Sequence, residues 1–324
     1  MKRVRLMKGF ASISYLRVRS LTDYLIGTGG WGYFRVPDKP PLRAYSEVFN
    51  FVEVNYTFYE YPDTQMVKRW RRTVPLDFTF AVRCHQDLTH RLGLKPVDEA
   101  YTVFSRMLTY CEILSSPFLV LETPAGYVVN REEAKAARDF FSSSAFRGVN
   151  LVWEMRAPVT REALDLMRDF NMIECVDLSV KAPSVESDVL YSRLFGRGKH
   201  NLWQFTDDEL LTIDNEVDCI SPRIAALSFH GVKMNLDAAR YMQYKKTGDF
   251  VPVTDFTGVD SARAVLFEDT PFPISKSELI ENQGWKVIDL TLDKRVHLAE
   301  LLVNVPDKTY NSVDEVAEAL EAVM

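Results

Sequence analysis

Short apolar segments recur along the first three quarters of the chain, and polar segments with helical spacing separate many of them. Eight of the apolar segments have the length of a β-strand and end at polar or turn-forming residues. They lie at residues 24–28, 51–55, 78–84, 118–122, 150–155, 173–179, 189–195 and 224–230.

Strands that alternate with helices predict parallel pairing through right-handed crossovers. Eight such units within about 230 residues favour a closed TIM-type (β/α)8 barrel, an α/β fold, over an open sheet. The link between the sixth and seventh strands is too short for a full helix, so the barrel is expected to be somewhat irregular there. Capping boxes mark predicted helix starts at Asn130 with Glu133, Thr206 with Glu209, and Ser312 with Glu315.

The barrel domain is expected to occupy residues 24–250. A basic N-terminal extension precedes it at residues 1–23, and a further segment follows it at residues 251–324. That last segment carries a capping pair, Ser275 with Glu278, and alternates helical and strand-like stretches. We therefore predict a small C-terminal α/β appendage rather than an unstructured tail.

Composition adds few constraints to this picture. With 47% apolar and 26% charged residues, the chain is typical of globular proteins, and its net charge of −6 gives no reason to expect a dedicated nucleic-acid binder. Its four cysteines form no CxxC pair, so neither a zinc knuckle nor a disulfide scaffold is indicated. No apolar run approaches the roughly 18 residues of a membrane span, and no signal-peptide core is present, which favours a cytoplasmic protein without a membrane partner.

A glycine-rich segment, GTGGWG at residues 27–32, follows the first strand, and Glu53 lies about 20 residues further on. Both features occur in dinucleotide-binding folds. Such a site requires a helix that begins at the last glycine, because its N-terminal amides hold the pyrophosphate. Pro37, Pro40 and Pro41 exclude an immediate long helix, so we interpret the segment as a tight turn at the barrel mouth.

Polar side chains gather near the carboxyl ends of six predicted strands, which is where (β/α)8 barrels place their chemistry. Residues two apart share one face of a strand, so these side chains are expected to converge inside the barrel. An internal salt-bridge network is the structural alternative, although six converging polar strands exceed what packing requires. The set comprises Glu53, Asn55, Arg83, His85, Glu154, Arg156, Asp177, Arg193 and His230.

Further candidates lie in loops and helices. His90 follows the third strand, and residues 195–199 (FGRGK) follow the seventh, where barrels often bind phosphate. The basic segment 68–72 (KRWRR) predicts either a nucleic-acid contact or, with more weight, a solvated helix face. The aromatic residues Tyr56 and Tyr59 would stand at the mouth.

The ligand types of a divalent metal are present, but no local spacing such as HxxxH joins them. The interleaved arginines would repel a cation and favour an anion. We therefore predict no cofactor and keep a divalent metal as an alternative. The residues of a metal-binding type are Glu53, His85, Glu122, Glu154, Asp177 and His230.

Five motifs occur in a specific order: IGTGGWGYF at 26–34, FVEVNYTFYEYP at 51–62, FTFAVRCHQDLTH at 78–90, VWEMRAP at 152–158 and SRLFG at 192–196. Together they resemble the YecE-like family, known as domain of unknown function 72. The resemblance covers roughly residues 24–251 and implies a TIM-type barrel but no established reaction. The family's motif positions map onto Trp31, Glu53, Asn55, Thr57, Tyr59, Arg83, His90, Glu154, Arg156, Asp177 and Arg193.

The chain departs from the family pattern at four positions. Gly29 stands where the family usually has serine, and Arg83 stands where it usually has lysine, which argues against covalent amine catalysis. Phe195 replaces a histidine of the seventh strand's motif, while His230 stands where asparagine is typical. The pattern is that of a histidine moved between neighbouring strands.

The leading functional hypothesis is an enzyme, hydrolase-like in its acid–base chemistry, that acts on a small anionic molecule, with phosphate-bearing compounds among the candidate substrates. Glu53 and Glu154 would divide the acid and base roles, because carboxylates in unlike surroundings can differ in pKa. Asp177 and His85 complete the expected catalytic set. The expected substrate-binding residues are Trp31, Asn55, Tyr59, Arg83, His90, Arg156, Arg193 and His230.

Two other classes of function stay open. A protein that binds or processes nucleic acid would use the basic N-terminus, the helix around Trp70, and mouth aromatics that stack on a base. A non-catalytic ligand-binding scaffold would use the C-terminal appendage as its partner surface, since a barrel fold does not fix a function. The sequence does not indicate an oligomeric state.

Overall fold

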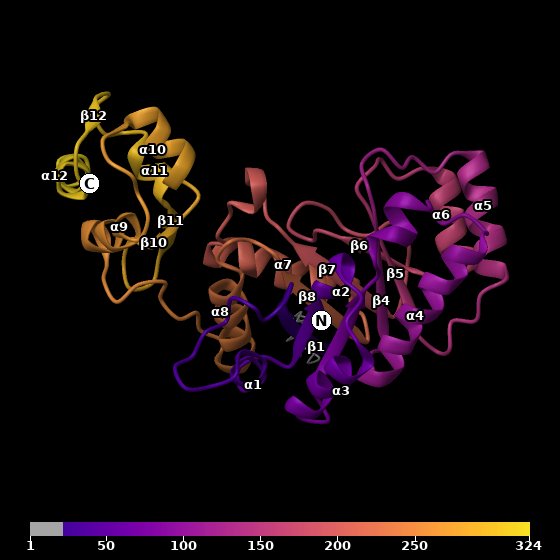
Figure 1. Ribbon diagram of the computed structural model, residues 1–324. Helices are drawn as coiled ribbons and strands as arrows, with labels where there is room; N and C mark the ends of the chain where they lie inside the picture. Colours follow the sequence, from indigo (N-terminus) through magenta and orange to yellow (C-terminus); the bar gives the residue numbers. More distant parts are fainter. Residues whose placement is uncertain (1–21) are drawn as a thin grey trace, which may run out of the picture.

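The computed structural model describes residues 22–324, and its main body is a closed barrel of eight parallel strands in the order β1 to β8 (Figure 1). The predicted TIM-type barrel is confirmed, and no strand begins more than one residue from its predicted start. The predicted basic extension lies almost wholly outside the described residues. The strands are β1 (Asp23–Thr28), β2 (Phe51–Val54), β3 (Thr79–Arg83), β4 (Phe118–Thr123), β5 (Asn150–Met155), β6 (Ile173–Val176), β7 (Val189–Leu194) and β8 (Ile224–Phe229).

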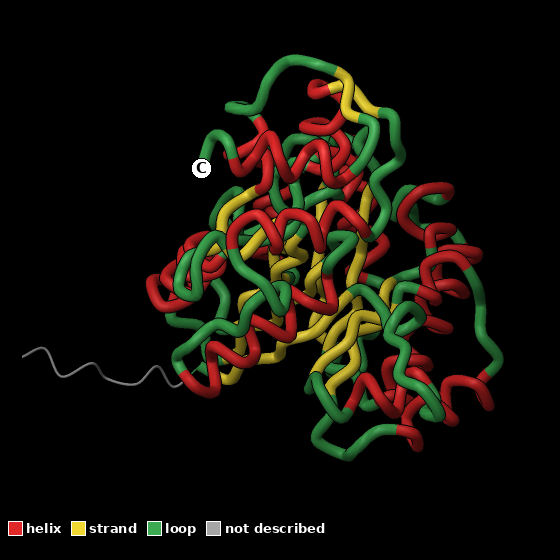
Figure 2. The backbone as a smooth tube through the Cα atoms, turned by 90° about the vertical axis from the view of Figure 1, so that its left-hand side faces the viewer, coloured by secondary structure: helices red, strands yellow, loops and turns green. Residues whose placement is uncertain are grey.

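Helices surround these strands on the outside of the barrel, as Figure 2 shows. No helix interrupts the link from β6 to β7, so the predicted irregular crossover is confirmed. The glycine segment after β1 leads into a helix only at Pro41, as expected for a turn. The barrel's helical elements are α1 (Pro41–Ser46), α2 (Tyr56–Tyr59), α3 (Thr64–Thr73), the π-helical turn η1 (Asp87–Arg91), α4 (Asp98–Leu114), α5 (Arg131–Ser142), α6 (Arg161–Asp169), the 3-10 turn η2 (Lys199–Asn201), α7 (Asp207–Ile220) and α8 (Met234–Thr247).

All four predicted helix N-caps are present. The side chains of Asn130, Thr206, Ser275 and Ser312 each accept a hydrogen bond from the backbone N–H of the third helical residue. At Thr206 and Ser275 the glutamate of the capping box also accepts from the cap's own backbone N–H. These local bonds satisfy amides that the helix itself leaves unpaired, which is why the sequence marks the helix starts well.

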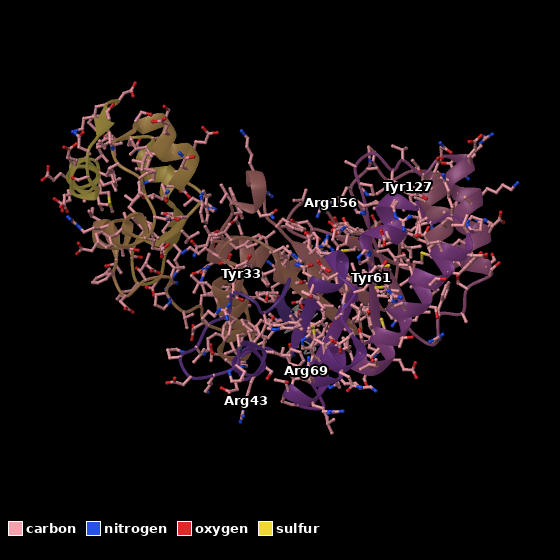
Figure 3. The ribbon with its side chains drawn as sticks, viewed as in Figure 1. Tyr33, Arg43, Tyr61, Arg69, Tyr127 and Arg156 are labelled. Carbon is pink, nitrogen blue, oxygen red and sulfur yellow. The ribbon has the colours of Figure 1, made fainter. Side chains whose placement is uncertain are left out.

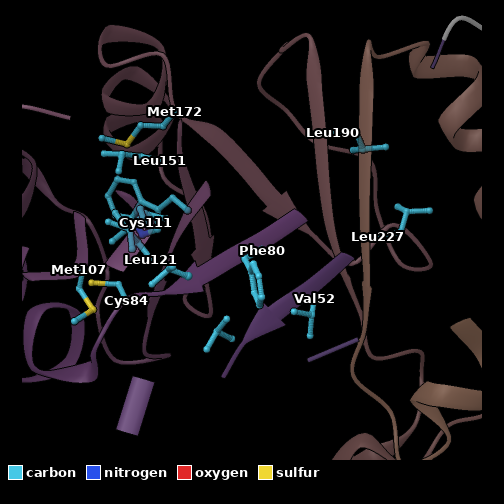
Figure 4. Packing of buried hydrophobic residues seen from close by; sticks show 14 of the residues in the cluster. Val52, Phe80, Cys84, Met107, Cys111, Leu121, Leu151, Met172, Leu190 and Leu227 are labelled. Atoms are coloured by element: carbon cyan, nitrogen blue, oxygen red, sulfur yellow. The ribbon is translucent and has the colours of Figure 1, made fainter. Parts of the chain in front are cut away.

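Alternation along the strands separates two apolar cores. The outer core lies between strands and helices and includes Val52, Phe80 and Leu121 of the strands together with Met107 and Cys111 of α4 (Figure 4). Because both faces of a parallel strand are buried, its apolar run is nearly continuous. The inner core fills the barrel with Phe51, Ala81, Phe118, Val120, Val152, Ile173, Cys175, Val189, Tyr191 and Ala226.

The junction of β1 with β2 depends on side chains. These strands pair only at Gly27 with Phe51 and at Thr28 with Val52, whereas β1 pairs with β8 along its whole length. The buried Tyr45 hydroxyl accepts from the Thr28 N–H at 2.8 Å and donates to the Phe51 carbonyl at 2.9 Å. Only glycine fits at position 27, because a Cβ there would stand 1.9 Å from the Phe51 carbonyl oxygen.

The segment after α8 folds around an apolar core of its own, seen in gold to yellow at one side of Figure 1. Two antiparallel pairs, β10 with β11 and β9 with β12, organise its helices. The elements are α9 (Gly258–Phe267), β9 (Ile274–Ser275), α10 (Lys276–Gln283), β10 (Val287–Asp289), β11 (Arg295–His297), α11 (Leu298–Leu302), β12 (Thr309–Tyr310) and α12 (Val313–Glu321).

Polar contacts join this C-terminal unit to the start of α7. Arg295 Nη1 lies 2.8 Å from an Asp207 carboxylate oxygen, and His297 Nε2 lies 3.2 Å from Glu209 Oε2. The ring of His297 also packs on Trp203, with 4.3 Å between ring centroids.

Across residues 22–324, no helix is both long enough and apolar enough to cross a bilayer.

Replacing Tyr45 with phenylalanine tests the side-chain junction between β1 and β2. Tyr45→Phe keeps the ring but leaves the Thr28 N–H and the Phe51 carbonyl without their partner, so we expect a loss of about 3 kcal/mol in the free energy of unfolding. Urea denaturation followed by circular dichroism measures it. Tyr33→Phe is the control, because Tyr33 is 86% exposed, and equal stability of both variants would contradict the assignment.

Candidate active site at the barrel mouth

Charged side chains from five strands form one ion-pair network directly above the inner core. Arg193 on β7 is its centre and is only 2% exposed. Its Nη1 donates to Glu122 at 2.5 Å and also to Glu154, and its Nε lies 3.2 Å from Glu53 Oε1. Three carboxylates face three guanidinium groups, so the formal charges of the network balance. The six members are Glu53, Arg83, Glu122, Glu154, Arg156 and Arg193.

An open pocket of about 650 Å³ lies over this network at the carboxyl ends of the strands. That volume falls in the range of small-molecule sites. Arg83, Glu122 and Arg193 line it together with His230. Arg156 stands at the rim with 42% of its side chain exposed, on the upper side of the barrel in Figure 3.

Glu53 lies beneath the pocket and is fully buried. Tyr191 donates its hydroxyl to Glu53 Oε2 at 2.9 Å. Burial would raise the pKa of the Glu53 carboxyl, but Arg193, His230 and Arg83 outweigh burial and hold that pKa well below its ordinary value. Glu53 is therefore an ionised anchor for Arg193 and does not line the pocket.

His230 is the titratable histidine of the pocket. Its Nε2 lies 3.0 Å from Ser228 Oγ, 3.3 Å from Arg193 Nε and 3.8 Å from Glu53 Oε2. Burial and Arg193 lower the pKa of His230 below its ordinary 6.5, against the opposing effect of Glu53. The ring is therefore neutral near neutral pH and can accept a proton.

Three positions that depart from the family pattern lie together in space. The ring of Phe195 stacks on His230, with 4.9 Å between centroids and 29° between planes. A Cβ at Gly29 would stand 2.4 Å from the His230 ring, so any side chain at Gly29 would displace that histidine. The guanidinium carbons of Arg156 and Arg193 lie 5.0 and 5.2 Å from the Phe195 ring centroid. The departures from the family pattern at Gly29, Phe195 and His230 are therefore coupled, because these three residues pack against one another.

The other expected substrate-binding residues surround the same mouth. Asn55 Nδ2 donates to the Gly29 carbonyl at 2.6 Å, and its Oδ1 accepts from Arg83 Nη1 at 3.1 Å. Tyr59 lines the pocket and is 59% exposed. His90 lies close enough to the network for the Glu122 charge to act on it. Burial lowers the pKa of His90, and Glu122 opposes that shift. Trp31 lines an adjoining pocket instead.

Two expected catalytic residues have contacts outside the network. His85 stacks on Tyr61, with 3.8 Å between centroids, and its Nδ1 lies 3.3 Å from Asp87 Oδ2. Asp177 holds the loop after β7, because its Oδ2 accepts from the backbone N–H groups of Phe195 and Gly196 at 2.9 and 3.0 Å. Those two amides are therefore occupied, which removes support for a phosphate cradle at residues 195–199.

Glu122 is the member of the network whose place the sequence did not predict. It was considered only as a metal-ligand type, yet its Oε2 accepts from Arg83, Arg193 and Arg156 at 2.5, 2.5 and 3.4 Å. The signal was available, because Glu122 stands two residues after the inward-facing Val120 and therefore shares its face of β4. Among residues 22–324, no group of three or more histidine, cysteine, aspartate or glutamate side chains is arranged to hold a metal ion.

Comparison with known proteins agrees with this architecture. The model of a family described as "Protein of unknown function DUF72" matches residues 25–243. The chain belongs to the DUF72 family. The curated UPF0759 protein YecE of Escherichia coli K12 is 35% identical over 63 residues, which cover 19% of this chain and 23% of that relative.

Solved structures of DUF72 proteins share the fold. One from Thermotoga maritima superposes with a TM-score of 0.56 at 18% identity, over 69% of this chain and 99% of that one. One from Enterococcus faecalis superposes with a TM-score of 0.54 at 15% identity, over 69% and 97%. Both superpositions leave about three tenths of this chain uncovered.

Removing the Glu53 charge tests the network. We expect Glu53→Gln to lower the free energy of unfolding by about 3–5 kcal/mol near pH 7, because it leaves the buried Arg193 undercompensated. A lowered folded pKa contributes stability that is complete above about pH 4.5 and is lost as pH falls. The difference from wild type should therefore narrow below about pH 4.5.

Denaturant midpoints measured from about pH 7 to about pH 3 supply the comparison. Glu318→Gln is the matched control, because Glu318 is exposed on α12 and outside the network. A difference between Glu53→Gln and wild type that stayed constant across this range would count against an ionised Glu53.

Proposed function

We propose that this DUF72 protein is an enzyme that carries out acid–base chemistry on a small anionic substrate at the carboxyl-end mouth of its barrel. The observation that carries the proposal is an open pocket over a charge-balanced network, with a neutral, buried histidine beside that network. Buried ion pairs contribute little net stability, so stability alone does not account for this network. The pocket instead gives a ligand access to it.

Binding of the anion falls to the arginines. Arg156 is the most accessible of the three, and Arg83 and Arg193 line the floor with their guanidinium groups held by carboxylates. Planar guanidinium groups match carboxylate and phosphate oxygens in pairs. Asn55, which is fixed between the β1 loop and Arg83, would orient the substrate.

Proton transfer falls to His230 rather than to Glu53. Ser228 Oγ and Glu53 Oε2 face Nε2, and the tautomer that donates from Nε2 to Ser228 leaves Nδ1 unprotonated on the Gly29 side, where Gly29 lines the pocket. Glu53 then holds Arg193 and the ring in place from below. Glu122 is the carboxylate that reaches the pocket floor and would serve as the second proton-transfer group.

Variants at the mouth test these roles. Incubation with a panel of phosphate monoesters and small carboxylic acids, followed by mass spectrometry, identifies a converted compound. We expect His230→Asn to lower kcat about 10²- to 10⁴-fold, because it removes the proton acceptor. Arg156→Gln should raise KM with little change in kcat, because it removes a contact to the anion that is equal in ground and transition states.

Arg43→Gln is the matched arginine control, since Arg43 lies on α1, on the opposite side of the barrel from Arg156 in Figure 3. Conversion that survives both His230→Asn and Glu122→Gln would rule out this assignment. Binding of panel compounds without conversion of any would favour the scaffold hypothesis.

The pH profile gives an independent test of His230. Since its pKa lies below 6.5, the proton-accepting form predominates at neutral pH. We expect kcat/KM to be constant around pH 7 and to fall only below about pH 6.5, as the ring takes up a proton. An acid limb that is unchanged in a partly active His230 variant would contradict the role.

A further inference from the structure

A second pocket of about 610 Å³ adjoins the mouth, and aromatic side chains dominate its lining. It shares Gly29, Tyr33, Asn55 and Tyr59 with the mouth pocket. The two cavities therefore form one continuous surface that is cationic at one end and aromatic at the other. The aromatic lining residues are Trp31, Tyr33, Tyr56, Tyr59 and Trp70.

The rings stand at steep angles to one another. Trp70 meets Trp31 at 77° with 5.3 Å between centroids, and it meets Tyr56 at 81° with 5.9 Å. Tyr56 and Tyr59 are 46% and 59% exposed, so ring surface remains open to the solvent. Packing alone does not require such exposure, because α2, which carries both tyrosines, buries Thr57 and Phe58 instead. An aromatic cluster that is left open beside a polar pocket is typical of a ligand site.

Glycine backbone forms another part of this pocket. Gly30 has a φ of +117°, and a Cβ built at Gly30 or Gly32 meets no atom within 4 Å. Neither glycine is therefore required by a close neighbour within the described residues. Bare backbone beside open ring faces leaves room for a flat group to lie against the rings.

The surrounding charge selects the occupant. The guanidinium carbon of Arg83 lies 5.9 Å from the Tyr59 ring centroid, at the boundary of the two pockets. A positively charged ligand, which aromatic cages otherwise attract, would be repelled by this arginine and by Arg156. A ligand with a flat uncharged ring and an anionic group would satisfy both ends.

We propose that the substrate is a nucleotide-type anion, with its heteroaromatic ring in the aromatic pocket and its anionic group over Arg83 and Arg156. The inference rests on the proposed function for its anionic end and adds the ring. Aromatic side chains stack on every nucleobase, because each base offers a π-face. The ring pocket therefore sets the substrate class, and the mouth performs the chemistry.

Equilibrium binding tests the inference without requiring turnover. Isothermal titration calorimetry compares adenosine monophosphate, ribose 5-phosphate and adenosine on the full chain. We expect adenosine monophosphate to bind roughly tenfold or more tightly than ribose 5-phosphate, because only the nucleotide fills both pockets. It should also change the tryptophan fluorescence, to which Trp31 and Trp70 contribute.

Variants of the ring pocket sharpen the comparison. Gly32→Leu fills the pocket from a site with open space, and Tyr56→Ala removes an exposed ring that lines the aromatic pocket and not the mouth pocket, so neither should unfold the chain. We expect both to reduce the affinity for adenosine monophosphate to that for ribose 5-phosphate, which itself should be unchanged. Tyr56→Phe keeps the ring and should restore the nucleotide preference.

The outcomes separate this inference from the proposed function. Equal affinities for adenosine monophosphate and ribose 5-phosphate would overturn the ring site and leave the anion site standing. Adenosine that binds as tightly as its monophosphate would overturn the anion site, and with it the proposed function. A single-stranded oligonucleotide that binds far more tightly, with an affinity that falls steeply with salt, would overturn a small-molecule substrate in favour of nucleic acid.

Discussion

The buried guanidinium of Arg193 is the constraint on which the upper half of the barrel depends. A charge removed from water must be paired, and Arg193 finds Glu53, Glu122 and Glu154 on three other strands. Those carboxylates need Arg83 and Arg156 to balance their charge, so one buried guanidinium accounts for the whole polar layer. The pairing also sets pKa values, because the arginines keep Glu53 and Glu122 ionised while Arg193 and burial keep His230 neutral.

The sequence predicted the barrel well because its signals are local. Strand-length apolar runs, capping pairs and a short sixth link all depend on neighbouring residues, and each has its counterpart in β1–β8, in the N-caps and in the helix-free crossover. Alternation likewise placed Glu53, Arg83, Glu154 and Arg193 in one layer. Which of them reaches solvent depends on contacts across the barrel, and for that reason Glu53 was expected at the surface of the site and lies beneath it.

The same limit explains Asp177, His85 and Glu122. Asp177 stands at the end of β6 as a catalytic residue would, but the direction of the following loop turns its carboxylate toward the amides of residues 195 and 196. His85 follows β3 in the inward phase, yet the chain leaves the barrel there and the ring stacks outside on Tyr61. Glu122 lacked a polar neighbour two residues away, so no pair drew attention to it. Loop direction is a tertiary property that strand periodicity does not encode.

One wall of the mouth connects the site with the C-terminal unit. Asp177 fixes the start of the loop after β7, and the loop then packs so closely that a Cβ at Gly196 would stand 2.1 Å from the Trp203 ring. Trp203 in turn carries the ring of His297 from the C-terminal unit. Phe195, which stacks on His230, is the residue directly before Gly196. A displacement of the C-terminal unit would therefore reach His230 through two ring contacts and one glycine turn, so this unit supports the geometry of the site although it contributes no residue to the pocket.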